Sequence, residues 1–119
     1  ILVVDDEESV REVMCDLLVQ AGYRVLRAAN GLEALRVYTM NQQKISLVLL
    51  DLIMPEMSGK ECSRKLVEIN PSVKIVLASG YTANTNIEEE SLPGVKAFLA
   101  KPYEPVDMLD VMRRILDTD

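Results

Sequence analysis

Five short apolar runs, separated by longer segments with helical patterns, limit the fold of this chain more than any other feature. The runs cover residues 1–4, 24–28, 46–50, 74–78 and 96–100, a spacing typical of repeated strand–helix units. The first, third and fourth runs are almost entirely apolar, as parallel strands covered on both faces are. Right-handed crossovers place the intervening helices on both faces. The sequence therefore predicts an α/β protein, a doubly wound (βα)5 sheet of five parallel strands.

Most of the helical segments carry apolar stripes with the i, i+3, i+4 spacing of a helix that packs on a sheet. The first stripe is Val10, Val13, Met14, Leu17, Leu18 and Ala21, and the last is Val106, Leu109, Met112, Ile115 and Leu116. Segment 82–92 differs, because it is polar and has no such stripe. We expect a short, weakly packed fourth helix there, and the alternative is a loop.

Size and composition indicate one globular domain over residues 1–119. Hydrophobic residues make up 49% of the chain and charged residues 27%, which argues against disorder. The net charge of −6 argues against direct nucleic-acid binding, which depends on Lys and Arg. No apolar run approaches the ~20 residues of a membrane span and no signal peptide precedes the first strand, so we expect a cytoplasmic domain without membrane contact. Cys15 and Cys62 fall in helical apolar patterns, and we expect them to be reduced core residues.

Polar side chains follow four of the predicted strands. They are Asp5, Asp6, Asp51, Ser79 and Lys101. In an open parallel sheet, ligands bind outside the carboxyl ends of the strands, and all five residues belong to those ends. A carboxylate after so apolar a run as 46–50 is costly unless it has a function there, and this draws attention to Asp51.

Each of the other residues also has an ordinary structural explanation. Asp5 and Asp6 could cap the first helix. Ser79 could belong to a turn, and Lys101 could be a solvated residue before a proline. The joint pattern of three carboxylates and a lysine is what favours a divalent-metal and phosphoryl site.

Clustered carboxylates repel one another unless a cation neutralises them. Mg²⁺ fits best, because it prefers hard oxygen ligands and takes one or two carboxylates together with waters and a phosphate oxygen. The chain has no histidine, and neither cysteine follows a strand, so the residues do not suit zinc.

Four motifs in these positions resemble one known family. They are VVDDE at 3–7, LDLIMPEMSG at 50–59, LASG at 77–80 and FLAKPY at 98–103. Together they look like the receiver domain of bacterial two-component response regulators, and the resemblance covers the whole chain. It implies a flavodoxin-like fold with strand order 2-1-3-4-5. It also implies phosphorelay signalling, in which a histidine kinase or a histidine phosphotransfer domain is the partner.

The resemblance implies roles at the metal. Asp51 would be the phosphoacceptor, a carboxylate nucleophile toward phosphohistidine. Asp6 and Asp51 would bind Mg²⁺, or Mn²⁺, directly. The backbone carbonyl of Ile53 would be a third protein ligand, and Asp5 would act through water. Such a domain is not an enzyme in isolation, but an acceptor that phosphorylates itself and loses the phosphoryl group slowly.

The resemblance also implies roles at the phosphoryl group. Lys101 would pair with one of its oxygens, and Ser79 would donate its hydroxyl to another. Phe98 resembles the family's switch aromatic, and the alternative is an ordinary core residue. Ser79 and Phe98 would then change the surface of helix 4, strand 5 and helix 5, which could also support a homodimer. The peptide bond between Lys101 and Pro102 is expected to be cis.

Two residues predict a long-lived phosphoaspartate. Ile53, two residues after the acceptor, cannot hold a hydrolytic water, and Tyr81 could shield the site. The chain is either a stand-alone regulator or a piece of a larger protein. The Ser-Gly-Tyr at 79–81 and the short tail after the last helix are similar to receivers of hybrid sensor histidine kinases.

Three other functions are weaker. An aspartate-nucleophile phosphatase needs a second Asp at position 53, which is Ile. A nucleotide-binding Rossmann-like domain needs a Gly-rich loop after the first strand, where this chain has DDEE. A phosphorylation-independent interaction domain would usually lack the acceptor, the acidic pair or the lysine, and all three are present.

Overall fold

A single parallel sheet forms the centre of the molecule. The computed structural model describes residues 1–79, 92–100 and 104–117. The strands are β1 (Leu2–Val4), β2 (Leu26–Ala28), β3 (Val48–Asp51), β4 (Ile75–Ser79) and β5 (Val95–Ala100). They are parallel and lie in the order β2-β1-β3-β4-β5, which confirms the predicted architecture and strand order.

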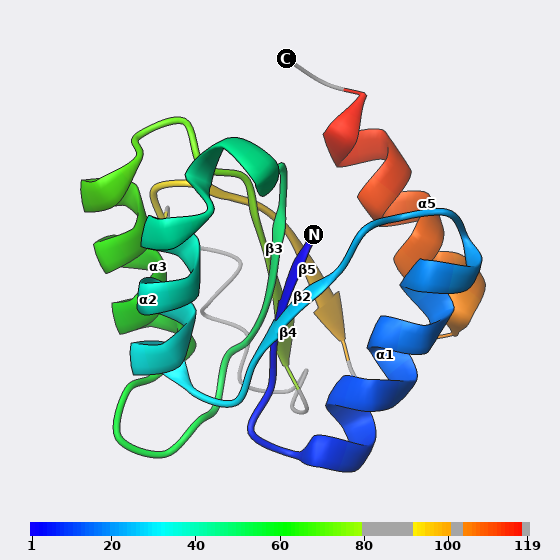
Figure 1. The fold of residues 1–119 in the computed structure, drawn as a ribbon, viewed down its shortest axis with the longest axis horizontal. Coiled ribbons are helices and arrows are strands. Elements are labelled where there is room, and N and C mark those ends of the chain that lie inside the picture. The colour runs from blue at the N-terminus through cyan, green and yellow to red at the C-terminus, as the bar shows by residue number, and fades with distance from the viewer. Residues whose placement is uncertain (80–91, 101–103, 118–119) are drawn as a thin grey trace.

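Helices cover both faces of this sheet. The described helices are α1 (Glu8–Gln20), α2 (Gly31–Met40), α3 (Gly59–Ile69) and α5 (Pro105–Leu116), with a short 3-10 helix η1 (Gln42–Lys44). Figure 1 shows α2 and α3 on one side and α1 and α5 on the other. Side chains of the strands alternate between the two layers. Leu2 and Val4 join the core under α2 and α3, and Val3 joins the core under α1 and α5.

Local sequence signals account for where several helices begin and end. Asn30 caps α2, because its side chain accepts a hydrogen bond from the Glu33 N–H at 2.8 Å. Ser58 caps α3 in the same way through the Glu61 N–H at 3.2 Å. Pro105 occupies the first turn of α5, where its missing N–H costs nothing.

Three residues of the predicted apolar stripes are exposed, and these predictions were wrong. One is Ala21, which follows the last residue of α1. Val13 in α1 is 59% exposed and Val106 in α5 is 60% exposed. The reason for Val106 is angular, because it precedes the buried Met108 by two residues, or about 200° around the helix. The same rotation separates Val13 from the buried Cys15.

Other predictions for the helical regions have mixed outcomes. The cysteines are free and buried, as predicted. Most of segment 82–92, the predicted fourth helix, lies outside the described residues, although Leu92 is described and packs in the core. None of the described helices has the length and apolar character needed to cross a membrane.

Candidate functional site

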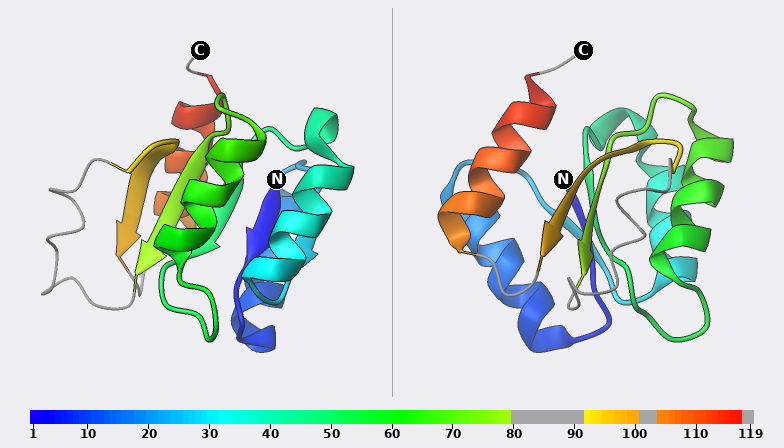
Figure 2. Two further views of the ribbon diagram at one scale, coloured as in Figure 1. Left: turned by 90° about the vertical axis from the view of Figure 1, so that its left-hand side faces the viewer. Right: turned by 180° about the vertical axis from the view of Figure 1, so that it is seen from behind.

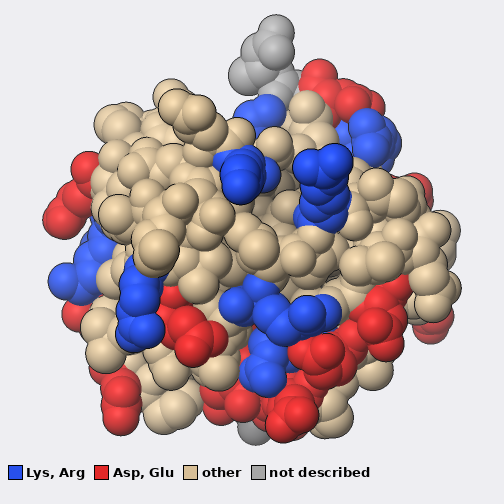
Figure 3. All heavy atoms as spheres, viewed as in Figure 1, with Lys and Arg blue, Asp and Glu red and all other residues tan. Residues whose placement is uncertain are grey.

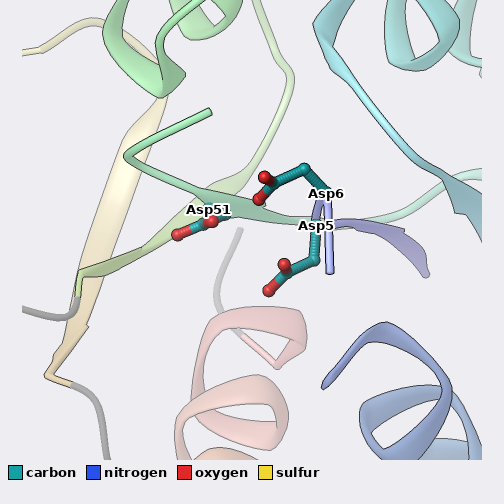
Figure 4. Close-up of side chains that lie close together, drawn as sticks. All are labelled: Asp5, Asp6 and Asp51. Atoms are coloured by element: carbon teal, nitrogen blue, oxygen red, sulfur yellow. The ribbon is translucent and has the colours of Figure 1, made fainter. Parts of the chain in front are cut away.

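The carboxyl ends of the central strands bring three aspartates together. The register pairs Val4 of β1 with Leu50 of β3, so the next residues along each strand, Asp5 and Asp51, lie side by side. One carboxylate oxygen from each of Asp5, Asp6 and Asp51 lies within 4.8 Å of the others. Figure 4 shows the three carboxylates turned toward the same side of the strand ends. The predicted acidic cluster therefore exists, at the point where the strand order reverses.

The three carboxylates differ in their exposure to water. Asp5 is fully buried, Asp51 is 8% exposed, and Asp6 is exposed at the rim. One Asp5 oxygen, Oδ1, accepts a hydrogen bond from the Glu7 N–H at 3.0 Å. This contact is an Asx turn that orients the start of α1. Asp5 is thus partly committed to local structure. The N-cap residue of α1 is Glu7, without a side-chain cap hydrogen bond, so the alternative that Asp5 and Asp6 cap this helix was wrong.

A close backbone approach holds Asp51 in place. Beyond the end of β3, the Leu52 N–H donates to the Ala78 carbonyl at 2.8 Å, and the Gly59 N–H donates to the Leu52 carbonyl at 2.7 Å. A Cβ on Gly59 would lie 2.6 Å from the Asp51 carbonyl oxygen. Only glycine allows α3 to begin this close to the strand end.

The loop between β3 and α3 combines exposure, burial and backbone strain. Ile53 is 58% exposed, whereas Met54 and Met57 are buried. Met57 packs against Gly31, the first residue of α2. The two residues lie so close that a Cβ on Gly31 would be 2.7 Å from the Met57 sulfur. Glu56 has φ of 69°, in the left-handed region that disfavours a side chain. The loop that follows Asp51 is therefore held by contacts to α2 and α3 at some cost in backbone energy.

The remaining predicted residues are only partly described. Ser79 is the last residue of β4, and its register partner is Ala100 of β5. Its backbone lies at the same end of the sheet as Asp51, which pairs with the preceding residue, Ala78. Lys101 follows β5 directly in sequence, and it lies outside the described residues together with Tyr81 and the Lys101–Pro102 bond. Figure 2 shows the carboxyl ends of β4 and β5 at the same end of the sheet.

Phe98 lies in β5 opposite Leu77 of β4 and is partly buried. It packs against the core under α2 and α3. This contact fits the ordinary core interpretation, and the switch role stays a prediction.

One residue near the site escaped the sequence analysis. Arg11, in the first turns of α1, donates from Nη1 to the Asp5 carbonyl at 3.0 Å. The signal available in sequence was its position six residues after a strand-end aspartate, on a helix that must turn back over the sheet. That spacing alone does not say where a long side chain ends.

The donor set suits a hard divalent cation. Carboxylate oxygens are the ligands that Mg²⁺ prefers, and the cluster combines one exposed carboxylate with two that are buried. Such a cluster could neutralise the cation while its open side faces solvent.

Comparison with known proteins decides the family. The family profile of the response regulator receiver domain matches residues 1–113. The chain belongs to the response regulator receiver domain family. It is thus a receiver domain of two-component phosphorelays, a family whose general function is Mg²⁺-dependent phosphorylation of an aspartate.

Two curated relatives and one solved structure illustrate the similarity. The chemotaxis protein CheY of Thermotoga maritima is 31% identical over 116 residues, covering 97% of this chain and 95% of that protein. The sensor kinase CckA of Brucella abortus is 30% identical over 117 residues, covering 98% of this receiver and 12% of the kinase. The response regulator TrrA of Thermotoga maritima, solved in complex with Mg²⁺ and BeF, has a TM-score of 0.85 and 28% identity over 96% of each chain.

Proposed function

We propose that Asp51 is the phosphoacceptor of this receiver. The observation that carries the proposal is the position of Asp51 at the end of the central strand β3, with an oxygen within 4.8 Å of both Asp5 and Asp6. Asp5 is fully buried and accepts a hydrogen bond from the Glu7 N–H, and Asp6 lies at the exposed rim. Asp51 lies between them in burial, and of the three it is the one that is itself the last residue of a strand.

The reaction is a displacement at phosphorus. A carboxylate oxygen of Asp51 forms a bond to the phosphorus of a phosphohistidine, and the bond from phosphorus to the imidazole nitrogen breaks. The nitrogen keeps the electron pair and takes a proton from water. The product is an aspartyl phosphate, which stores the signal until water hydrolyses it.

The metal in this proposal is Mg²⁺, with Mn²⁺ as an alternative that takes the same oxygen ligands. Asp6 and Asp51 would hold it directly, the Ile53 carbonyl would be a third protein ligand, and Asp5 would act through water. When bound, the metal neutralises charge on the phosphoryl oxygens and orients them for displacement. Asp5 has an oxygen engaged by the Glu7 N–H, which supports an indirect role for this carboxylate.

Lys101 and Ser79 complete the proposed site. Lys101 would neutralise one phosphoryl oxygen, and the Ser79 hydroxyl would donate to another. The support is topological, because β4 ends at Ser79 beside the end of β3, and β5, which pairs with β4, ends one residue before Lys101. Ser79 and Phe98 would then transmit the change to the surface around β5 and α5.

The partner is a histidine kinase or a histidine phosphotransfer domain, because this domain has no histidine and cannot itself supply phosphohistidine. We place this domain in the cytoplasm, as an acceptor that does not turn over substrate. The match to a small part of a sensor kinase supports an origin in a hybrid kinase. A homodimer through the surface of β5 and α5 is a further proposal.

Incubation with acetyl phosphate and Mg²⁺ tests the proposed acceptor. The wild-type chain should incorporate one base-labile phosphate, and chelation of the metal should prevent it. Asp51→Asn keeps the size of the side chain and removes the nucleophile, so it should incorporate none. Glu7→Gln, beside the cluster but outside the proposed ligands, is the matched control and should behave as wild type. Equal labelling of Asp51→Asn would contradict the assignment.

A further inference from the structure

Arg11 turns its side chain from α1 toward the carboxyl end of β1. Its Nη1 donates to the Asp5 carbonyl at 3.0 Å, and only 14% of its side chain is exposed. A guanidinium is costly to withdraw from water unless its N–H groups find acceptors. We infer that Arg11 is a positioning residue for the metal and phosphoryl site, acting through the peptide unit that joins Asp5 to Asp6. This inference rests on the function proposed above.

The geometry of that peptide unit explains the effect. The Asp5 carbonyl and the Asp6 N–H belong to one planar group, so a restraint on the carbonyl also restrains the Cα of Asp6. The last register pairs of β1 with its neighbours are at Val4, so the peptide lies beyond the regular ladder. Arg11 extends the restraint past the end of the strand. The direction of the exposed Asp6 carboxylate, a proposed direct ligand, depends on this restraint.

Glu12 contacts Arg11 at its Nε and also forms an ion pair with a second arginine, Arg27. Glu12 Oε2 lies 3.7 Å from the Arg11 Nε and 3.1 Å from the Arg27 Nε. Glu12 and Arg27 are about half exposed, so this network orients the side chains more than it stabilises the fold. Figure 3 shows basic and acidic side chains side by side over β2 and α1 on this face. Arg27 thus carries the same charge as Arg11 on this face and is linked to it only through Glu12 among these contacts.

If Arg11 acts by positioning Asp6, its removal should change the Mg²⁺ affinity in the direction opposite to that expected from its charge alone. Arg11 is a positive charge near the carboxylates, so removing the charge alone would strengthen Mg²⁺ binding. Removing the restraint on Asp6 would weaken it, because loss of a group that orients a metal ligand typically costs about 10–100-fold in metal affinity. The sign of the change therefore separates the two roles.

The test uses the full chain and three variants. Arg11→Met removes the charge and donors at similar length, Arg11→Lys keeps the charge without the planar fork, and Arg27→Met is the control within the same network. Calorimetry gives the Mg²⁺ dissociation constant. Labelling by acetyl phosphate across Mg²⁺ concentrations gives the half-saturating metal concentration and the maximal rate. Thermal unfolding without metal reports the stability of each variant.

Arg11→Met should raise both the dissociation constant and the half-saturating Mg²⁺ concentration about tenfold or more. Its maximal rate at saturating Mg²⁺ should stay within about twofold of wild type, a split that general destabilisation would not produce. Arg11→Lys should lie between Arg11→Met and wild type, several-fold weaker than wild type. Arg27→Met should bind Mg²⁺ as wild type does. If Arg11→Met does not fold, the Mg²⁺ affinity of Arg11→Lys alone tests the inference.

Unchanged or tighter Mg²⁺ binding in Arg11→Met, or equal weakening in Arg27→Met, would overturn the inference. Wild-type affinity in Arg11→Lys would also overturn it where that variant decides alone. These failures differ from failure of the proposed function, in which the wild-type chain itself would take no phosphate on Asp51.

Discussion

Gly59 approaches the backbone of Asp51 so closely that a Cβ on Gly59 would lie 2.6 Å from the Asp51 carbonyl oxygen. Gly59→Ala must therefore move either the first turn of α3 or the end of β3. We expect a loss of about 1–3 kcal/mol in the free energy of unfolding, as for other overpacked sites. We also expect weaker Mg²⁺ binding, because the shift displaces the proposed acceptor.

Gly22→Ala is the matched control for that variant. Gly22 has φ of 97°, so an alanine there is strained, but no heavy atom lies within 4 Å of the added Cβ. This variant should lose about 1 kcal/mol without any change in Mg²⁺ affinity. Urea unfolding and calorimetry of the pair separate stability from site geometry. A Gly59→Ala variant that binds Mg²⁺ as tightly as Gly22→Ala would contradict the prediction.

The backbone at Glu56 offers a stabilising substitution. Its φ of 69° costs a residue with a normal Cβ about 1–2 kcal/mol, and asparagine tolerates this region better. Glu56→Asn should raise the free energy of unfolding by about 0.5–1 kcal/mol. Glu56→Val should lower it, because a β-branched side chain is poorly tolerated there. Urea unfolding measures both, and changes of the same sign would show that strain at this residue does not matter.

Cys62 should make stability fall with pH in the alkaline range. Burial, with a smaller effect of Glu61, raises the pKa of the Cys62 thiol from 9.0 to about 11. Between these values the unfolded chain loses the proton and the folded chain keeps it. The contribution is therefore complete below pH 9 and is lost as the pH rises toward 11, by roughly 1–3 kcal/mol.

Urea unfolding of wild type and Cys62→Ala at pH 8 and pH 10.5 isolates this contribution, since other titrating groups are common to both proteins. The variant should be less stable at pH 8, because its thiol is fully buried, and should lose less stability on going to pH 10.5. Parallel pH profiles would mean that the thiol does not couple to folding.

The exposed side chain of Ile53 predicts the lifetime of the phosphorylated state. An apolar residue two positions after Asp51 cannot hold a hydrolytic water, so Ile53→Asn should shorten the lifetime several-fold. At 58% exposure this change should leave the fold intact. Loss of label after removal of the phosphodonor gives the two decay rates, with Ile53→Val as the apolar control. Equal rates for wild type and Ile53→Asn would refute the idea.

The parts of the site that the sequence predicted depend on topology. Asp5, Asp6 and Asp51 meet because the carboxyl ends of β1 and β3 are adjacent, which follows from the alternation of apolar runs and helices. The predicted strand 24–28 begins two residues later in the structure, as Leu26–Ala28. The predicted strand 46–50 begins two residues later and ends one residue later, as Val48–Asp51. Exact ends depend on pairing with neighbours, which a single run does not contain.

The parts that the sequence could not predict depend on distances between segments. The contact from Arg11 to the Asp5 carbonyl requires knowing how α1 packs, and the approach of Gly59 to Asp51 requires the path of the loop between them. Val106 shows a related limit, because a residue at the edge of an apolar stripe can face water. The roles proposed for Ser79 and Lys101 rest on strand order and family resemblance.

The central claim is that Asp51 accepts the phosphoryl group, and locating the modification tests it most directly. Borohydride converts an aspartyl phosphate to homoserine, which changes the peptide mass at the modified residue alone. After incubation with acetyl phosphate and Mg²⁺, peptide mass spectrometry should find homoserine at position 51, and none after incubation without metal. Homoserine at position 5 or 6 instead, or none in wild type with Mg²⁺ present, would contradict the account.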